Sequence, residues 1–382
     1  MGESADVVVV GGGIVGCAAA YELAAAGAGR VVLLERAEAV GLGSTGACAG
    51  GFRQQFTTEV NVRLSQASVP LILGFAERHG LPVDVSQDGY LFLVRDEASW
   101  EGFLRGVELQ RSFGVEVDVL DAAEAAALVP GIAVHDVVGA TFGPRDGIAD
   151  PGALTQGYAT IARRAGVELR LGVRADRLRA RAGRVRGVET ADGEVSAGAV
   201  VLATGAWTAG LAASAGLAVP IDPVPRVVVT TSAFPGVPSR RTLVIDAATS
   251  FYFHREADGV LMGMAGDDTV GFDLVVDRAF VAERLLPRAL EVFPPLEAAG
   301  IRSSWAGLYE MTPDRHPIVG ETPLEGLFVA AGFSGHGFQH GPIVGKLLAE
   351  LVVQGQARSV DVSALAYGRF ARGDLVREGH VV

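Results

Sequence analysis

Residues 6–35 read DVVVVGGGIVGCAAAYELAAAGAGRVVLLE. A run of valines at 7–10 leads into a glycine cluster, and an alanine-rich stretch at 14–26 has the composition of a helix. A second apolar run follows at 31–34, after two glycines that end the helix. This order predicts a βαβ unit, the building block of a parallel sheet that is covered by helices.

The glycine cluster fits the spacing of a dinucleotide-binding turn. Gly11 permits the tight turn, Gly13 lets the backbone approach a pyrophosphate, and Gly16 allows the helix to pack closely on the strand. Glu35 stands at the end of the second strand, where a carboxylate can accept hydrogen bonds from ribose hydroxyls and disfavours the 2′-phosphate of NADP. A glycine-rich turn without a ligand is the alternative, but the flanking strand, helix and carboxylate favour a dinucleotide.

The rest of the chain alternates between two kinds of segment. Stretches with parallel-sheet character predict a nucleotide-binding domain made from residues 1–80, 145–219 and 311–382. Short strands and amphipathic helices predict a second domain at 81–144 and 220–310. The predicted fold class is therefore α/β, a Rossmann-like domain into which an α+β domain built on an antiparallel sheet is inserted.

Further strands are predicted in the later parts of the nucleotide-binding domain. Turn signals separate four short strands that indicate a β-meander, at residues 167–171, 177–181, 184–190 and 194–196. A buried strand at 199–203 then returns the chain to the parallel sheet. The last strand, at 327–331, precedes a helix that is predicted to run from Pro342 to about residue 353.

The composition excludes several classes of function. The chain has 382 residues and a formal charge of −12 without basic clusters interleaved with aromatic residues, so no nucleic-acid partner is expected. The only two cysteines, Cys17 and Cys48, cannot form a four-ligand zinc site by themselves, and no metal is expected. Glycines interrupt the apolar opening, and Glu3 and Asp6 precede it, which predicts no membrane span, no signal peptide and a cytoplasmic location.

The segment AGFSGHGF at residues 331–338 favours FAD over NAD. It joins the last strand to a helix, and it therefore presents several backbone N–H groups and the positive end of a helix dipole. Reduced flavin carries negative charge along its N1 and C2 carbonyl edge, whereas nicotinamide makes no such demand on the protein. A glycine-rich helix start with a structural role only is the alternative interpretation.

Five segments of the sequence resemble the family of FAD-dependent enzymes that includes glycine oxidase, D-amino-acid oxidase and sarcosine oxidase. They match in order and spacing from end to end, and they are the glycine turn with Glu35 and residues 43–46, 203–207, 312–320 and 332–338. Residues 44–46, followed by GFRQQF at 51–56, are most similar to the β subunits of sarcosine oxidase and of dye-linked L-proline dehydrogenase. The resemblance implies an FAD domain into which a substrate domain is inserted twice.

The resemblance also implies which residues contact the cofactor. Ser44 and Thr45 would lie near the pyrophosphate or the flavin, and Val173 would meet the adenine through its backbone. His336 and its neighbouring glycines would face the isoalloxazine. The full implied set is Gly11, Gly13, Ile14, Val15, Gly16, Glu35, Arg36, Ser44, Thr45, Val173, Thr204, Gly205, Trp207, Gly332, Gly335, His336, Gly337, Phe338 and Gln339.

Arg53 leads the residues that the resemblance assigns to the substrate. It occupies the place of an arginine that holds the substrate carboxylate in sarcosine oxidases, and its planar fork suits two-point recognition of that group. A solvated loop arginine or a phosphate contact is the alternative. Tyr309, Tyr252 and His254 would shape the opposite wall, with His336 close to the flavin. Either histidine could deprotonate the substrate ammonium, or be a packed ring without an acid–base role.

Three departures from the family pattern limit the transfer. Gln339 stands where monomeric sarcosine oxidases have a lysine that shares the carboxylate, so hydrogen bonding would replace part of the charge. Gly307 replaces the cysteine that tethers flavin, which predicts non-covalent FAD. Leu261 stands where the oxidases place an oxygen-activating lysine, so O2 and another electron acceptor both stay open.

The predicted function is oxidation of the C–N bond of a small amino acid, or of an N-substituted amino acid, to an imine by hydride transfer to FAD. Two alternatives stay open. A 2-hydroxy acid would be held by Arg53 equally well, and a non-catalytic FAD-binding subunit of an assembly would keep the same fold. The chain is expected to act on a small molecule, with a homo- or hetero-oligomeric state left open.

Overall fold

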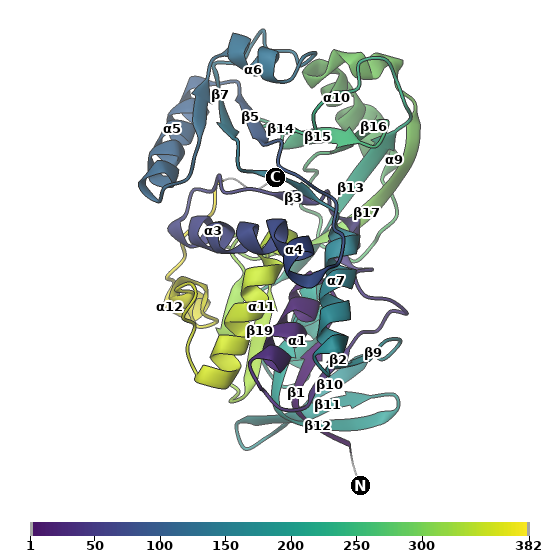
Figure 1. Ribbon diagram of the computed structural model, residues 1–382, viewed down its shortest axis with the longest axis vertical. Coiled ribbons are helices and arrows are strands. Elements are labelled where there is room, and N and C mark those ends of the chain that lie inside the picture. Colours follow the sequence, from purple (N-terminus) through teal and green to yellow (C-terminus); the bar gives the residue numbers. More distant parts are fainter. Residues whose placement is uncertain (1–2, 380–382) are drawn as a thin grey trace.

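The computed structural model describes residues 3–379, and two eight-stranded sheets dominate it. The first sheet lies in the lower half of Figure 1 and the second in the upper half. The first contains the path β10-β11-β12-β1-β2-β9, with β19 added beside β12 and β18 beside β19. The second follows the order β17-β13-β16-β15-β14-β5-β7-β6. The predicted fold class, a Rossmann-like domain combined with an α+β domain, is confirmed.

Five parallel strands form the centre of the first sheet. β1 (Glu3–Val10) pairs with β2 (Val31–Leu34) on one side and β12 (Gly193–Leu202) on the other. β9 (Glu168–Arg170) extends the sheet beyond β2, and β19 (Leu327–Ala331) extends it beyond β12. Successive β1 valines enter cores on opposite faces, as the alternation of side chains along a strand requires.

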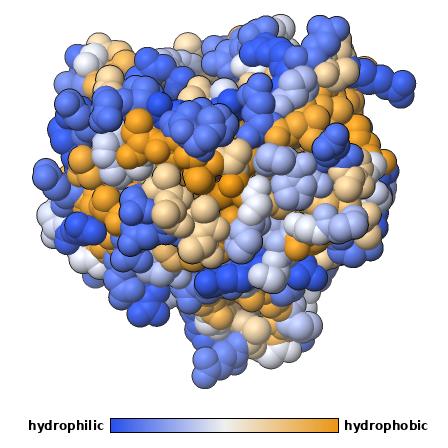
Figure 2. Space-filling model, turned by 90° about the horizontal axis from the view of Figure 1, so that it is seen from above, coloured by the Kyte–Doolittle hydropathy of each residue, from blue (hydrophilic) through white to orange (hydrophobic). Residues whose placement is uncertain are grey.

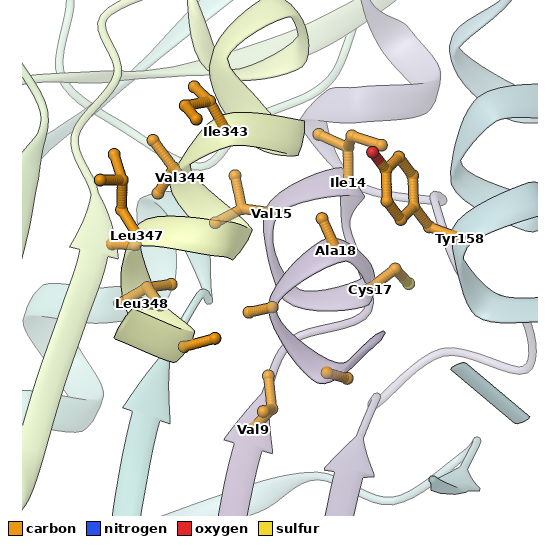
Figure 3. Packing of buried hydrophobic residues seen from close by; sticks show 14 of the residues in the cluster. Val9, Ile14, Val15, Cys17, Ala18, Tyr158, Ile343, Val344, Leu347 and Leu348 are labelled. Atoms are coloured by element: carbon orange, nitrogen blue, oxygen red, sulfur yellow. The ribbon is translucent and has the colours of Figure 1, made fainter. Parts of the chain in front are cut away.

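Helix α1 (Ile14–Ala25) packs between α7 (Pro151–Arg164) and α11 (Gly337–Gln354) on one face of this sheet. Figure 3 shows α11 side chains beside α1 on one side and Tyr158 of α7 on the other. A Cβ atom at position 345 would lie 2.6 Å from Ala18 Cβ, so glycine at this position lets the two helices approach closely. The alanine-rich composition of α1 thus serves burial between two helices.

Two details of the predicted meander are wrong. Residues 168–170 do not join it, because they follow the crossover helix α7 and pair in parallel with β2 at the far edge. The meander contains β10 (Ala175–Arg181), β11 (Arg184–Thr190) and the first half of β12. The strands predicted at 194–196 and 199–203 are one strand, since β12 pairs antiparallel with β11 and then continues in parallel with β1.

The second sheet is antiparallel except for one pair. β5 (Tyr90–Val94) and β14 (Leu243–Asp246) run parallel, and they join strands from the two stretches predicted as the inserted domain. β7 (Gly139–Gly143) flanks β5, while β13 (Asp222–Thr231) and β17 (Ile301–Met311) pair along ten registered positions from Asp222↔Met311 to Thr231↔Ile301. This division of strands supports the predicted domain boundaries, which remain a proposal; residues 1–2 and 380–382 of that prediction lie outside the described residues.

A small third sheet is formed where the chain passes from one large sheet to the other. It contains β3 (Gly51–Phe52), β8 (Gly147–Ala149) and β4 (Val85–Ser86). α3 (Glu59–Leu73) follows β3 after an irregular segment that begins with Arg53.

The remaining strands complete the large sheets, and they are β6 (Asp118–Leu120), β15 (Phe251–Glu256), β16 (Gly259–Gly263) and β18 (Ile318–Glu321). The remaining α-helices are α2 (Ser44–Ala47), α4 (Phe75–His79), α5 (Glu97–Ser112), α6 (Ala122–Leu128), α8 (Thr208–Ala213), α9 (Arg278–Phe280), α10 (Leu286–Val292) and α12 (Arg369–Arg372). Within residues 3–379, none of the helices combines the length and the apolar character needed to cross a bilayer. Seen from the second-sheet end, charged and polar side chains separate the apolar patches (Figure 2).

Candidate functional site

A cavity of about 550 Å³ extends from the glycine turn of the first sheet to the inner side of the second. Most of the predicted site residues line it together, namely Gly11, Gly13, Ile14, Val15, Glu35, Arg36, Ser44, Thr45, Arg53, Val173, Thr204, Gly205, Trp207, Tyr252, Tyr309, Gly335, His336, Gly337, Phe338 and Gln339. Gly16, Gly332 and His254 are absent from this lining. The fold therefore gathers segments from both large sheets around one space.

The glycine turn brings strand, helix and cavity together. Gly11 has a φ of +108°, and a Cβ atom there would lie 2.3 Å from the carbonyl oxygen of Ala203. A Cβ atom at Gly16 would lie 1.9 Å from the carbonyl oxygen of Gly11. Both positions thus require glycine, Gly11 for its backbone conformation and Gly16 for helix packing.

Glu35 is fixed at the cavity wall by backbone groups. Its Oε2 accepts a hydrogen bond from Gly12 N at 2.6 Å, and its Oε1 accepts one from Ala37 N at 2.8 Å. The carboxylate keeps further acceptor capacity for hydroxyl donors. Beside it, the Arg36 guanidinium lies 3.7 Å above the Trp207 ring, which gives this end of the cavity a flat wall.

The helix at the opposite wall begins earlier than predicted. α11 starts at Gly337, with His336 as its N-cap, and Pro342 lies inside the helix. The prediction took Pro342 as the first-turn residue, but the glycine-rich segment itself forms the first turn. Gly337, Phe338 and Gln339 line the cavity, so the positive end of the helix dipole lies at its wall.

Arg53 is a buried cation of the cavity wall, and it is not a solvated loop residue. Only 4 % of the residue is exposed. Its Nη1 donates to Gln55 O at 2.6 Å, and its guanidinium lies 4.2 Å from the Phe56 ring centroid. Burial lowers the pKa of Arg53, while negative groups nearby, including Glu378, raise it. The guanidinium is thus held by neighbours that leave it little freedom.

Gln339 contacts Arg53 from the first turn of α11, while its predicted contact with the substrate carboxylate stays a prediction. Its Oε1 accepts a hydrogen bond from the backbone N of Arg53 at 2.7 Å. Its Nε2 lies 3.2 Å from His340 Nε2. Both ends of the amide therefore have protein partners, and Gln339 positions the backbone of Arg53.

His336 lines the cavity as a buried, neutral ring. Its Nε2 lies 3.4 Å from Arg53 Nη2, and because arginine only donates, Nε2 is the acceptor and Nδ1 carries the proton. Within the described residues this buried Nδ1 has no hydrogen-bond partner. Burial and the charge of Arg53 hold the pKa of His336 well below its usual range, so the ring is neutral. These features oppose the predicted role as a base.

The two predicted tyrosines lie at the cavity, but His254 does not. Tyr252 and Tyr309 line the cavity, and burial raises the pKa of both hydroxyls. His254 lies outside the lining, with Nδ1 2.8 Å from Arg255 O, and burial lowers its pKa to about 4. This placement does not support a wall or base role for His254. Tyr90, whose hydroxyl lies beside Gly51, lines the cavity instead and was missed because it sits in an ordinary apolar strand pattern.

Residues 6–351 match the family model described as FAD dependent oxidoreductase. The chain belongs to this family. This FAD-dependent oxidoreductase is 30 % identical to FAD-dependent oxidoreductase domain-containing protein 1 of Xenopus laevis, over all of the chain and 85 % of that protein. The predicted family resemblance is confirmed.

Two solved structures share the whole architecture of the oxidoreductase. L-proline dehydrogenase from P. horikoshii has a TM-score of 0.92 at 34 % identity, with 98 % of this chain and 100 % of that one covered. Glycine oxidase from Geobacillus kaustophilus has a TM-score of 0.86 at 31 % identity, with 96 % and 99 % covered. The similarity to L-proline dehydrogenase agrees with residues 44–46 and 51–56, which resemble the β subunit of dye-linked L-proline dehydrogenase.

The residues around the cavity fit FAD. Glycines at 11, 12, 13, 335 and 337 line the cavity, so the backbone can approach a cofactor closely there. The N-terminus of α11 offers backbone donors to a flavin edge that becomes negative on reduction. Glu35 offers acceptors for ribose hydroxyls at the far end. The oxidoreductase thus has a suitable group for each part of the cofactor.

Glu310 is a cavity residue that sequence reasoning missed. Its Oε2 accepts a hydrogen bond from Gly332 N at 2.9 Å, and burial raises its pKa to about 7. Between its ordinary pKa and about 7, the unfolded chain ionises while the folded protein keeps the proton. The free energy of unfolding therefore falls as pH rises through this window. The signal that could have found Glu310 is an acidic residue between Tyr309 and the apolar Met311.

Glu310→Gln is expected to stabilise the protein more at pH 8 than at pH 5. A neutral amide does not ionise, so the variant keeps the free energy of unfolding that the wild type loses between pH 5 and pH 8. The gain in unfolding free energy from the substitution should therefore be about 2–3 kcal/mol larger at pH 8 than at pH 5. Urea unfolding of the FAD-free protein at both pH values measures it. An equal effect of the substitution at the two pH values would contradict a raised pKa.

Proposed function

We propose that this FAD-dependent oxidoreductase oxidises the C–N bond of a small amino acid, or of an N-substituted amino acid, to an imine. The observation that carries the proposal is the buried guanidinium of Arg53 at the wall of the FAD cavity, beside the neutral ring of His336. Relatives named glycine oxidase and L-proline dehydrogenase support an amino-acid substrate. When bound, FAD supplies a two-electron acceptor for hydride.

Arg53 orients the substrate through its carboxylate. A buried planar cation can make two parallel hydrogen bonds with a carboxylate, which fixes both the position and the rotation of the small molecule. The Phe56 ring below the guanidinium and the Gln55 carbonyl keep the fork in one orientation. Orientation supplies much of the catalysis in this chemistry, because neither a nucleophile nor a metal is needed.

Apolar and aromatic side chains limit the substrate to a small size. Leu243, Ile245, Tyr252 and Tyr309 from three strands of the second sheet, β14, β15 and β17, line the cavity on this side. The substrate carbon gives up its hydrogen with the bonding electrons, the nitrogen lone pair forms the C=N bond, and a nitrogen proton passes to water. Hydrolysis of the imine follows. His336 is assigned to holding Arg53 and not to proton removal, because its pKa is well below its usual range and its Nε2 accepts from the guanidinium.

Anaerobic bleaching of the flavin tests the proposal. Glycine, sarcosine and L-proline are compared with lactate and glycolate, and loss of the oxidised flavin absorbance is recorded. Bleaching by amino acids supports C–N oxidation, whereas bleaching by the hydroxy acids alone would establish the 2-hydroxy acid alternative. If none of a wider amine panel bleaches the flavin and a second polypeptide co-purifies, the chain is a non-catalytic assembly subunit.

We also propose non-covalent FAD in this site. A Cβ atom at position 307 would lie 2.6 Å from Ala47 Cβ, so the strand passes close to α2 where the related oxidases carry a tether. Acid precipitation is expected to release essentially all of the flavin into the supernatant, as measured by its absorbance. Flavin that stays in the protein pellet would contradict this prediction.

Leu261, at the position of the oxygen-activating lysine of the related oxidases, is buried on β16 and does not line the cavity. The electron acceptor, O2 or another, is therefore a question for experiment. Oxygen consumption with the bleaching substrate separates O2 from another acceptor. A cytoplasmic location and a homo- or hetero-oligomeric state are part of the same proposal.

A further inference from the structure

Residue Glu378 is a fully buried carboxylate that binds the segment following Arg53. Its exposed fraction is 0 %. Its Oε1 accepts hydrogen bonds from Thr57 N at 2.9 Å and from Thr57 Oγ1 at 2.5 Å. Its Oε2 accepts hydrogen bonds from Thr58 Oγ1 at 2.8 Å and from Asn61 Nδ2 at 3.0 Å. One side chain thus joins residues more than 300 positions apart in sequence.

The backbone around Glu378 is also anchored. Glu378 N donates to Asp314 O at 3.2 Å, and Gly379 N donates to Thr57 Oγ1 at 2.8 Å. Asp314 is itself held by the buried Arg369, whose Nε and Nη2 lie 2.7 and 3.0 Å from its carboxylate oxygens. A two-point ion pair of this kind fixes both partners in position. Glu378 therefore connects the Asp314–Arg369 ion pair to residues 57–61.

The connected segment carries the substrate-facing arginine. Residues 53–58 have no regular secondary structure between β3 and the start of α3, so side-chain contacts must fix their path. Gln339 binds the backbone N of Arg53 at the start of this segment, and Gln110 Nε2 binds Phe56 O at 2.9 Å in its middle. Glu378 binds its end. The Phe56 ring transmits this position to Arg53, because the guanidinium lies against it.

We propose that Glu378 is a positioning residue that fixes Arg53 for carboxylate binding, an inference that rests on the proposed function of Arg53. The carboxylate is suited to this task because it accepts from four donors at once, which an amide cannot do with one oxygen. Its negative charge also offsets part of the burial of Arg53. Loss of this residue should displace Arg53 without removing any group that touches substrate.

Glu378→Gln tests the inference, with Glu350→Gln as the matched control. Glu350 is also buried and accepts from Arg358 N, Ser359 N and Ser359 Oγ, but it lies near the far end of α11. The KM for the amino acid that bleaches the flavin is expected to rise about 10-fold in Glu378→Gln, with FAD content retained and kcat changed much less. Glu350→Gln should leave KM unchanged. Should Glu378→Gln fail to fold, Thr57→Val provides a smaller change, because it removes only one of the four donors to Glu378. It should also raise KM.

A double-mutant cycle distinguishes positioning from a general loss of stability. If Glu378 acts through Arg53, Glu378→Gln should cause no further loss of kcat/KM in the Arg53→Ala background. Independent losses that add, or an unchanged KM in both Glu378→Gln and Thr57→Val, would overturn the inference while leaving the proposed function intact. An unchanged KM in Arg53→Ala alone would instead overturn the proposed function, and this inference with it.

Discussion

Arg53→Ala is expected to raise the KM for the amino-acid substrate about 100-fold or more, while FAD stays bound. This result is expected because a buried cation that pairs with a carboxylate accounts for a few kcal/mol of binding, and its removal leaves the carboxylate buried without a partner. The glycine turn and Glu35 are unchanged by the substitution, so the cofactor keeps these contacts. Steady-state kinetics and the ratio of flavin to protein absorbance measure the two quantities.

Two variants sharpen the prediction for Arg53. Arg53→Lys keeps the charge but loses the planar fork, and it should fall between the wild type and Arg53→Ala. Arg145→Ala removes an exposed arginine whose partner is Glu116 on the surface, and it should leave KM unchanged. Equal KM values in wild type and Arg53→Ala would remove Arg53 from the substrate site.

Gly11→Ala is expected to abolish FAD binding. The backbone at Gly11 has a φ of +108°, which a side chain disfavours, and the new Cβ atom would lie 2.3 Å from Ala203 O. Because that carbonyl belongs to the strand end beside β1, relief of the contact would move the turn away from the cavity. Flavin absorbance of the purified protein and FAD titration of the apoprotein provide the measurements.

Gly271→Ala is the control for this loss. Gly271 lies outside the cavity lining, its φ is not in the left-handed region, and a Cβ atom there meets nothing within 4 Å. It should bind FAD like the wild type. Yellow Gly11→Ala protein with normal FAD affinity would show that the turn tolerates a side chain and would refute the structural requirement for glycine.

Local sequence patterns determined most of the first sheet. The valine and glycine runs of residues 7–35 fix two strands and one helix, since their signals are a few residues apart and act through backbone conformation. The same reasoning failed at β9 and at Pro342. Which strand a short segment pairs with depends on distant partners. A proline favours the first turn of a helix, but the surrounding packing can hold one further inside, at the cost of a backbone hydrogen bond.

The substrate end of the site depended on tertiary structure. Arg53, Gln339 and His336 could be chosen from motifs, but their hydrogen bonds to one another join positions 283 and 286 residues apart. These contacts show that Gln339 holds the backbone of Arg53 and that His336 Nε2 accepts from its guanidinium. Glu310, Tyr90 and Glu378 carry no local motif, so only the assembled fold shows that Glu310 and Tyr90 line the cavity and that Glu378 holds the segment after Arg53.

The sequence by itself determined the cofactor class, the family and the fold class of this protein, because steric requirements for glycine and the periodicity of apolar residues are properties of short segments. Only the tertiary structure decided which polar side chains meet and which of their atoms donate or accept. Burial and electrostatic interaction depend on distances through space, and segments far apart along the chain set those distances.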